Sequence, residues 1–229
     1  MRIVVIIPAR NEEQLIGRCL ESVMAAAAFA GVDPHITVVA DACTDGTAEV
    51  ARQFDGVHVL EVDGANVGLA RSVGVTWALR RAGAAASTLW IANTDADSVV
   101  PITWIAEQLE LAAGGTDLVI GTVRPDFTDL TAEQVAAWTA THVPGKPNGH
   151  VHGANLGIRA SIYEAAGGFA PLAEHEDVDL VARCAPLTSA VVATDASEVL
   201  TSGRQFGRTD GGYARYLRDD LIGSAELIA

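Results

Sequence analysis

The sequence predicts a doubly wound α/β fold with a mainly parallel central sheet. Within about 110 residues it contains four units in which an apolar, β-branched run is followed by a helix-like pattern, the order expected of parallel strands joined by helices. The first run, at 3–8, is continuously apolar, as expected of a strand covered by helices on both faces. No internal repeat or low-complexity linker interrupts the 229 residues, so we expect a single domain over 1–229.

The first unit is expected as a strand at 3–8 and a helix in the stretch NEEQLIGRCLESVMAAAA. Asn11 is the expected helix cap, and Glu12 and Glu13 suit the first turn because acids favour a helix N-terminus. In this interpretation Asn11 and Glu12 have a purely structural role, which stays open beside a role in binding. An apolar stripe of helical spacing follows, formed by Leu15, Ile16, Cys19, Leu20, Val23 and Met24.

The next three units have the same order. Strands are expected at 35–40, 57–62 and 88–92. Helices are expected from Ala48, over the stretch NVGLARSVGVTWALRRA, and from Pro101, because proline is favoured in the first helical turn.

The second half of the chain is less regular and is expected to pack against the same sheet. Its expected strands are at 118–123, 154–160 and 190–194, and its expected helices at 131–141, at 161–169, from the acidic segment EHEDVDL and at 212–222.

The composition favours a small-molecule ligand and the cytoplasm. The formal charge of −14 is spread along the chain, which argues against nucleic acid or an anionic membrane surface as the main partner. The three cysteines show no metal-type spacing, and an odd number makes a poor disulfide framework. The apolar runs are too short for a signal peptide or a membrane span, so we expect a soluble cytoplasmic protein without an integral membrane segment.

Polar loops follow the four strands of the first half. The loops at 8–13, 41–47, 66–71 and 93–97 are rich in carboxylates, amides or glycine. Because the carboxyl ends of parallel strands meet at one edge of a sheet and ligands bind there, we expect these loops to form one site.

Two carboxylates follow the fourth strand. In the stretch IANTDADSVVP, Asp95 and Asp97 are separated by one residue, and on extended backbone such side chains project to the same side. They can hold one cation together, although aspartates are also common turn residues.

Together these segments resemble the GT-A glycosyltransferases, in particular the nucleotide-sugar-dependent enzymes of family 2. The motifs cover residues 3–181 in the order VVIIPARNEE, VVADACTDGT, NVGLARSVG, NTDADS, HGANLGIRASIYEAAGGF and EHEDVDL. The resemblance implies a three-layer α/β/α domain in which residues 1–117 bind the nucleotide sugar and residues 118–229 the acceptor. It also implies a hexosyltransferase-type enzyme that moves a sugar from a nucleoside diphosphate to a hydroxyl of a small-molecule acceptor.

For the donor, the resemblance implies contacts from the first three loops. Residues that would wrap the base and ribose are Pro8, Ala9, Arg10 and Glu12. Asp41 is the candidate for binding the nucleobase, because Ala40 occupies the position where the family usually has an earlier acid. A uridine nucleotide is the default in the family. Gly68 would allow close backbone approach and Arg71 would meet a phosphate, the alternative for Arg71 being an exposed charge on an amphipathic helix.

The resemblance also implies the residues that bind the metal and the residue that acts as general base. Asp97 would bind Mn²⁺ or Mg²⁺, with Asp95 at the ribose, the sugar or the metal's outer shell, and the cation would stabilise charge on the departing diphosphate. In EHEDVDL, Asp177 is the expected general base and Glu176 its neighbour or the base itself, although acids also favour a helix start. We expect direct displacement with inversion, with a retaining outcome left open.

The remaining candidates lie in the second half. By resemblance, Gly153, Ala154 and Asn155 would line the floor under the donor sugar and acceptor. His150 and His152 either contact acceptor, phosphate or metal or are ordinary loop residues. Candidates for a lid over the diphosphate are Arg204 and Arg208, the alternative being a mobile surface loop.

Rival functions fit less well. A dinucleotide-dependent oxidoreductase needs a glycine-rich fingerprint that PARNEE lacks, and no P-loop motif is present. A sugar nucleotidyltransferase usually has a glycine- and basic-rich first loop, which is also missing here. A non-catalytic nucleotide-sugar binding module remains an alternative because of Ala40.

Overall fold

One eight-stranded sheet forms the centre of the molecule, in the order β3-β2-β1-β4-β7-β6-β8-β5. The computed structural model describes residues 1–208 and 211–226. The strands are β1 (Arg2–Ala9), β2 (His35–Asp41), β3 (Val57–Val62), β4 (Leu89–Asn93), β5 (Ser98–Val99), β6 (Leu118–Pro125), β7 (Leu156–Arg159) and β8 (Val191–Thr201). The first four are parallel, β7 is antiparallel to β4 and β6, β6 pairs with β8 in parallel, and β5 is antiparallel to β8. The sheet is therefore mainly parallel, as predicted.

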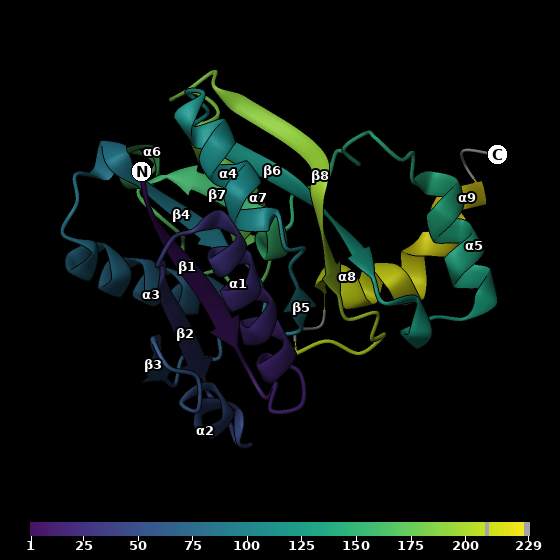
Figure 1. Cartoon of the computed structure of the whole chain (residues 1–229). Helices are drawn as coiled ribbons and strands as arrows, with labels where there is room; N and C mark the ends of the chain where they lie inside the picture. The colour runs from purple at the N-terminus through teal and green to yellow at the C-terminus, as the bar shows by residue number, and fades with distance from the viewer. Residues whose placement is uncertain (209–210, 227–229) are drawn as a thin grey trace.

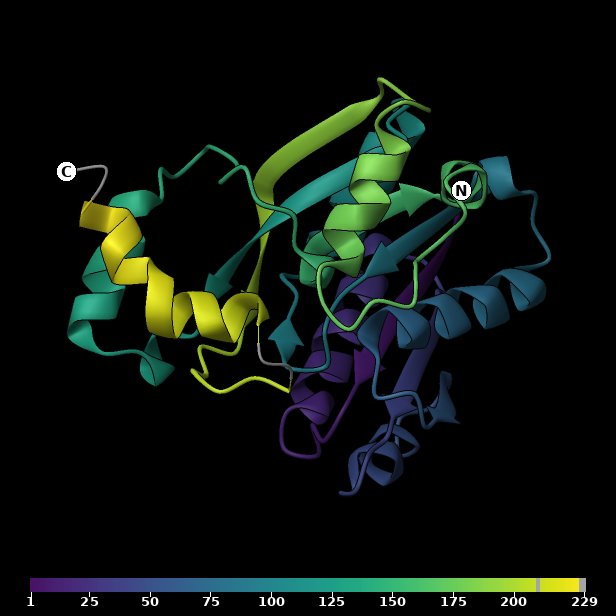
Figure 2. The same ribbon diagram turned by 180° about the vertical axis from the view of Figure 1, so that it is seen from behind.

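Helices cover both faces of the sheet, which gives three layers (Figures 1 and 2). The first face carries α1 (Ile16–Ala30), α2 (Thr47–Ala51) and α4 (Trp104–Ala113); the second carries α3 (Val67–Ala82), α6 (Ala160–Ala165) and α7 (Glu176–Cys184). Alternation along β1 decides which side chain packs where: Ile3, Val5 and Ile7 face the first layer, and Val4 and Ile6 the second. Both faces of β1 are thus buried, which explains its continuous apolar run.

A helical lobe lies beyond β8, at the right of Figure 1. It consists of α5 (Ala132–Thr141), α8 (Gly212–Arg215), a π-helical segment (Tyr216–Asp220) and α9 (Leu221–Glu226). Its small apolar cluster includes Trp138, Leu217 and Leu221. Short 3₁₀ turns occur at Ala86–Thr88, Phe127–Asp129 and Gly153–Asn155. None of the described helices is long and apolar enough to cross a membrane.

The predicted cap at Asn11 is wrong. Asn11 has a left-handed backbone with φ 55°, and α1 begins later, after Leu15, without a side-chain cap. The Oδ1 atom of Asn11 instead accepts a hydrogen bond from the backbone N–H of Thr44 at 2.7 Å. Asn11 therefore joins the loop after β1 to the loop after β2, a contact that local capping preferences do not reveal.

Two further boundaries differ from the prediction. Pro101 forms a turn whose carbonyl accepts from the N–H of Trp104, so α4 starts three residues after the expected proline. β8 continues to Thr201, well beyond the expected end at 194, because its last residues alternate between buried and half-buried positions against β6.

Candidate functional site

A cavity of about 660 Å³ opens at the carboxyl end of the parallel strands. Its first wall comes from the loops after β1, β2 and β4 and from the start of α3. The opposite wall comes from the segments around 148–154, 173–178 and 211–216 of the second half, whereas the segment 201–208 lines the cavity beside the loop after β1. The four loops expected at one rim do meet there.

The ends of β1 and β2 and the loops after them contribute several of the residues predicted to bind the nucleotide-sugar donor. Those that line the cavity are Pro8, Ala9, Arg10, Glu12 and Asp41. Asp41 is buried, and its carboxylate accepts the backbone N–H groups of Gly64 and Ala65, both at 2.8 Å, and of Asn66 at 2.6 Å. Asp41 thus orders the loop that leads into α3; its contact with a nucleobase stays a prediction.

Gly68 does not line the cavity, which differs from its predicted role. A Cβ at Gly68 would overlap the carbonyl oxygen of Ala170 and lie 2.8 Å from the nitrogen of Leu172. The backbone N–H of Gly68 donates to the carbonyl of Leu172 at 3.0 Å. The close approach that this glycine permits is therefore to the protein's own backbone.

Arg71 is buried and links the two acidic motifs, so it is not an exposed helix charge. Its Nη2 lies 2.5 Å from Oδ1 of Asp95, and its Nε donates to Oε1 of Glu176 at 3.0 Å. Gly153 leaves room for it, since a Cβ there would overlap Nη2. Nη1 is buried without a hydrogen-bond partner among residues 1–208 and 211–226. The phosphate contact expected of Arg71 stays a prediction.

Asp95 and Asp97 both line the cavity, but they differ in environment. The Asp97 side chain is 13% exposed, and its Oδ2 lies 2.8 Å from Nη2 of Arg204. Arg204 also contacts Glu12, with Nη1 2.7 Å from Oε1. Burial raises the pKa of Asp97 to about 6, Asp95 and Glu12 act in the same direction, and Arg204 opposes them. Arg204 thus bridges the carboxylates of Glu12 and Asp97.

This donor set fits a hard divalent cation. Carboxylate oxygens are the ligands that Mg²⁺ and Mn²⁺ prefer, and both aspartates lie on one rim. Within the described part of the chain, no three His, Cys, Asp or Glu side chains are grouped to hold a metal. A cation held by Asp95 and Asp97 would need further oxygen ligands from a bound diphosphate and water.

The acids of EHEDVDL separate into different contacts at the start of α7. Glu176 is buried and paired with Arg71, and burial raises its pKa. Asp177 accepts the backbone N–H of Gly153 on Oδ2 at 2.6 Å and that of Val178 on Oδ1 at 2.8 Å. Glu176 and Asp177 line the cavity, as predicted for catalytic candidates.

The other two acids have structural partners. Asp179 pairs with Arg183 at 2.6 Å and does not line the cavity. Glu174 accepts the backbone N–H of Gly211 at 2.6 Å, so it holds the segment that precedes α8. The four carboxylates therefore do not form one mutually repelling cluster.

Of the three residues predicted for the floor, Gly153 and Ala154 line the cavity and Asn155 does not. The Asn155 side chain is buried; its Nδ2 donates to the carbonyls of Thr122 and Ser197, and its Oδ1 accepts from Trp104 Nε1 at 2.9 Å. Asn155 satisfies backbone groups of β6 and β8 under the floor, because a buried amide requires partners on both ends.

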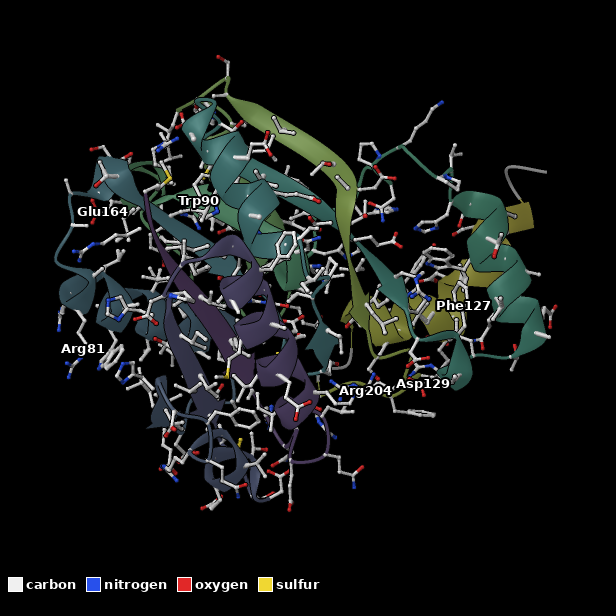
Figure 3. All side chains as sticks on the ribbon, viewed as in Figure 1. Arg81, Trp90, Phe127, Asp129, Glu164 and Arg204 are labelled. Atoms are coloured by element: carbon white, nitrogen blue, oxygen red, sulfur yellow. The ribbon has the colours of Figure 1, made fainter. Side chains whose placement is uncertain are left out.

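Arg204 and Arg208 follow β8 and contact the loop after β1. Arg208 donates from Nε to the carbonyl of Arg10 at 3.0 Å and lies 3.3 Å from Oε1 of Glu12. Figure 3 shows Arg204 near Asp129, whose carboxylate accepts the N–H of Gly203 at 2.8 Å. In this structure the segment is seated on the donor side of the cavity by side-chain and backbone contacts.

Rings that the sequence analysis did not single out line the far end of the cavity. These are His142, Tyr213 and Tyr216, next to the predicted His150 and His152. The tyrosines are three residues apart on one helical face, a spacing that is equally typical of a core contact. Their place at the cavity depends on how the C-terminal helices pack on α5.

Comparisons with known proteins agree with this architecture. The S. aureus TarS 1-349 structure in complex with UDP-GlcNAc has a TM-score of 0.70 and 14% identity, covering 100% of this chain and 70% of that chain. Mannosyltransferase PcManGT from Pyrobaculum calidifontis, in complex with GDP-Man and Mn²⁺, has a TM-score of 0.66 and 20% identity, covering 99% and 73%. Glucosyl-3-phosphoglycerate synthase from Mycobacterium tuberculosis, in complex with Mg²⁺ and UDP, has a TM-score of 0.56 and 19% identity, covering 89% and 72%.

These likenesses show the fold, which is that of the GT-A glycosyltransferases. The chain spans 66% of the length of another TarS 1-349 structure and 37% of a longer TarS structure. No curated protein matches the chain. The sequence model described as Glycosyl transferase family 2 matches residues 4–165, which is most of the 229 residues. The chain therefore belongs to glycosyl transferase family 2.

Proposed function

We propose that this glycosyltransferase moves a sugar from a nucleoside diphosphate, by default UDP, to a hydroxyl of a small-molecule acceptor with the help of Mn²⁺ or Mg²⁺. The observation that carries the proposal is that the carboxylates after β4 and those at the start of α7 face one cavity and are linked through Arg71. The structural neighbours hold UDP-GlcNAc, GDP-Man with Mn²⁺, and UDP with Mg²⁺.

The two halves of the chain have different tasks in this proposal. Residues 1–117 bind the nucleotide sugar with the loops after the first four strands. Residues 118–229 supply the acceptor side, because the segments at 148–154 and 211–216 line the cavity; Arg204 and Arg208 are the exception, since they contact the loop after β1.

Asp97, with Asp95 beside it, is the proposed metal ligand. When bound there, the cation would stabilise the negative charge that builds on the leaving nucleoside diphosphate. Arg204 and Arg208 are placed to add positive charge on the same side, which is the proposed role of the lid.

Asp177 is the proposed general base. Its carboxylate is oriented by the N–H of Gly153, whereas Glu176 is held in an ion pair by Arg71. Asp177 would take the proton of the acceptor hydroxyl while that oxygen bonds to the anomeric carbon and the bond from this carbon to the diphosphate breaks. Displacement from the opposite face inverts the configuration.

The test is calorimetric titration with UDP, GDP, CDP and TDP, each with Mn²⁺ and with a chelator. We expect one diphosphate to bind only with metal, and Asp97→Asn to weaken that binding about tenfold or more. Asp177→Asn should keep the binding and lower transfer about 100-fold or more. Asp179→Asn is the matched control on the same helix, because Asp179 lies outside the cavity.

Two outcomes would contradict the proposal. Failure of all four diphosphates to bind with metal would remove the donor site, and full transfer activity of Asp177→Asn would remove the assigned base. The non-catalytic alternative rested on Ala40, which is buried in β2 and does not line the main cavity. Metal-dependent donor hydrolysis that is lost in Asp97→Asn would exclude that alternative.

A further inference from the structure

We infer that the acceptor is an uncharged, hydroxyl-bearing ring compound that binds at the end of the cavity opposite the donor loops. This inference rests on the function proposed above and names its acceptor class. The residues that form this part, here called the aromatic end, are His142, His150, His152, Tyr213 and Tyr216.

The aromatic end has flat walls that meet at a steep angle. Tyr213 and Tyr216 lie nearly parallel, with an interplanar angle of 22° and ring centroids 6.0 Å apart. The ring of His152 meets that of Tyr213 at 82°, with centroids 5.6 Å apart. Flat aromatic surfaces pack well on the apolar face of a ring and poorly on an extended charged chain.

Burial keeps His152 and Tyr213 of this end uncharged. Burial lowers the pKa of His152 to about 4, and the nearby His150 and His142 act in the same direction. Burial raises the pKa of Tyr213, which keeps its phenol protonated. Neutral imidazole, phenol and the amide of Asn148, which also lines the cavity, can each hydrogen-bond a hydroxyl without a counter-ion.

The charges around this end disfavour an anionic acceptor. Three carboxylates of the second half, those of Glu174, Asp177 and Asp220, also line the cavity. Two arginines of the lining are paired with carboxylates: Arg71 with Asp95 and Glu176, and Arg215, whose Nε lies 3.9 Å from the carboxylate of Asp219. A phosphate or carboxylate on the acceptor would meet the like charge of these acids, which lowers its affinity.

The aromatic end also adjoins the proposed base. His152 precedes Gly153, whose N–H donates to Asp177 at 2.6 Å. A ring packed on Tyr213 and His152 therefore has a hydroxyl within reach of Asp177, which is what an acceptor requires.

The experiment measures binding to the wild-type chain by saturation-transfer NMR, in the presence of Mn²⁺ and the nucleoside diphosphate found by titration. The probes are methyl glucoside and myo-inositol as neutral polyol rings, 4-hydroxybenzyl alcohol as an aromatic alcohol, and glucose 6-phosphate and 3-phosphoglycerate as anions. We expect the neutral polyol rings, the aromatic alcohol or both to bind, and the anionic probes to bind at least about tenfold more weakly. Binding of the polyol rings would indicate a glycoside-like acceptor, and binding of the aromatic alcohol an aromatic one.

The matched variants are Tyr213→Ala and Tyr213→Phe. Tyr213→Ala should weaken binding of the neutral probe about tenfold, whereas Tyr213→Phe keeps the ring and most of the affinity. Calorimetric binding of the diphosphate should stay unchanged in both. Equal or tighter binding of the phosphorylated probes, no binding of any neutral ring, or unchanged probe binding by Tyr213→Ala would each overturn the inference. If the wild-type protein binds no nucleoside diphosphate in the presence of metal, the proposed function itself is refuted.

Discussion

Arg71 shows how one side chain can connect two motifs that are far apart in the chain. It comes from α3 and pairs with Asp95 after β4 and Glu176 at the start of α7. A buried guanidinium with two carboxylate partners fixes the relative position of these segments, because leaving either charge unpaired is costly. Arg71 is thus best described as a positioning residue between the proposed metal and base sites.

The raised pKa of Asp97 predicts a pH effect on stability. A pKa of about 6, against an ordinary value of 3.8, means that the folded protein binds this proton more tightly than the unfolded chain does. Asp97 therefore adds stability below about pH 4 that is lost as the pH rises through about 6. At pH 7.5 we expect Asp97→Asn to raise the free energy of unfolding by about 1–3 kcal/mol and to flatten the profile between these values.

The measurement is urea unfolding at a series of pH values, with Asp55→Asn as the control because Asp55 is exposed and outside the cavity. A parallel profile for Asp97→Asn and the wild type would contradict the prediction. The same substitution should weaken nucleotide binding. The carboxylate of Asp97 would then lower the stability of the fold while it supports function.

At the level of secondary structure, the start of α3 combines several contacts in a few residues. Asn66 caps the helix by accepting the N–H of Leu69 at 2.9 Å, and its Nδ2 donates to the carbonyl of Pro171. Asp41 binds the preceding backbone, and Gly68 packs on the segment at 170–172. The helix end that faces the donor side is therefore held on both sides by backbone contacts.

We predict that Gly68→Ala destabilises the protein. The added Cβ would meet backbone atoms of Ala170 and Leu172 on a segment that cannot yield without moving the start of α7. The expected loss is about 2 kcal/mol in the free energy of unfolding, measured by urea titration. Gly17→Ala in α1 is the control: its Cβ would meet only ordinary contacts at 3.9 Å, so a gain of about 0.5–1 kcal/mol is expected. Equal effects of both substitutions would show that close packing at Gly68 is unimportant.

Across the molecule, the segment after β8 connects the C-terminal lobe to the first loop of the sheet. The N–H of Ser202 donates to the carbonyl of Asp97, that of Gly203 to Asp129, and Arg204 bridges Glu12 and Asp97. Residues at opposite ends of the chain thus share the donor side of the cavity.

Arg204 and a divalent cation should compete for the carboxylate of Asp97. We expect Arg204→Met to tighten binding of Mn²⁺ alone about tenfold and to weaken the nucleoside diphosphate with Mn²⁺ present, since one phosphate-binding charge is lost. Spin-resonance titration measures the first and calorimetry the second. Arg208→Met is the control, because Arg208 contacts Glu12 and backbone carbonyls but not Asp97, and should leave Mn²⁺ binding unchanged. If Arg204→Met binds Mn²⁺ and the nucleoside diphosphate as tightly as the wild type does, Arg204 has a purely structural role.

Much of the fold and donor side was predictable from local patterns. The four successive strand-then-helix patterns marked a parallel sheet, and the rule that ligands bind at carboxyl strand ends predicted that Glu12, Asp41 and Asp97 share one rim. The family motifs added Asp177, which lines the same cavity; its role as general base stays a prediction. Periodicity and strand order report burial and direction, which are properties of short segments.

The partners of polar side chains were decided only by tertiary packing. Asn11 binds Thr44 and does not cap a helix, and Asn155 turns into the core to satisfy β6 and β8. Arg71 meets a residue 105 positions away, and Tyr213 reaches the cavity through the packing of the C-terminal helices on α5. A hydrogen bond or ion pair depends on distances of a few ångströms between segments far apart in the chain, and no local pattern encodes them.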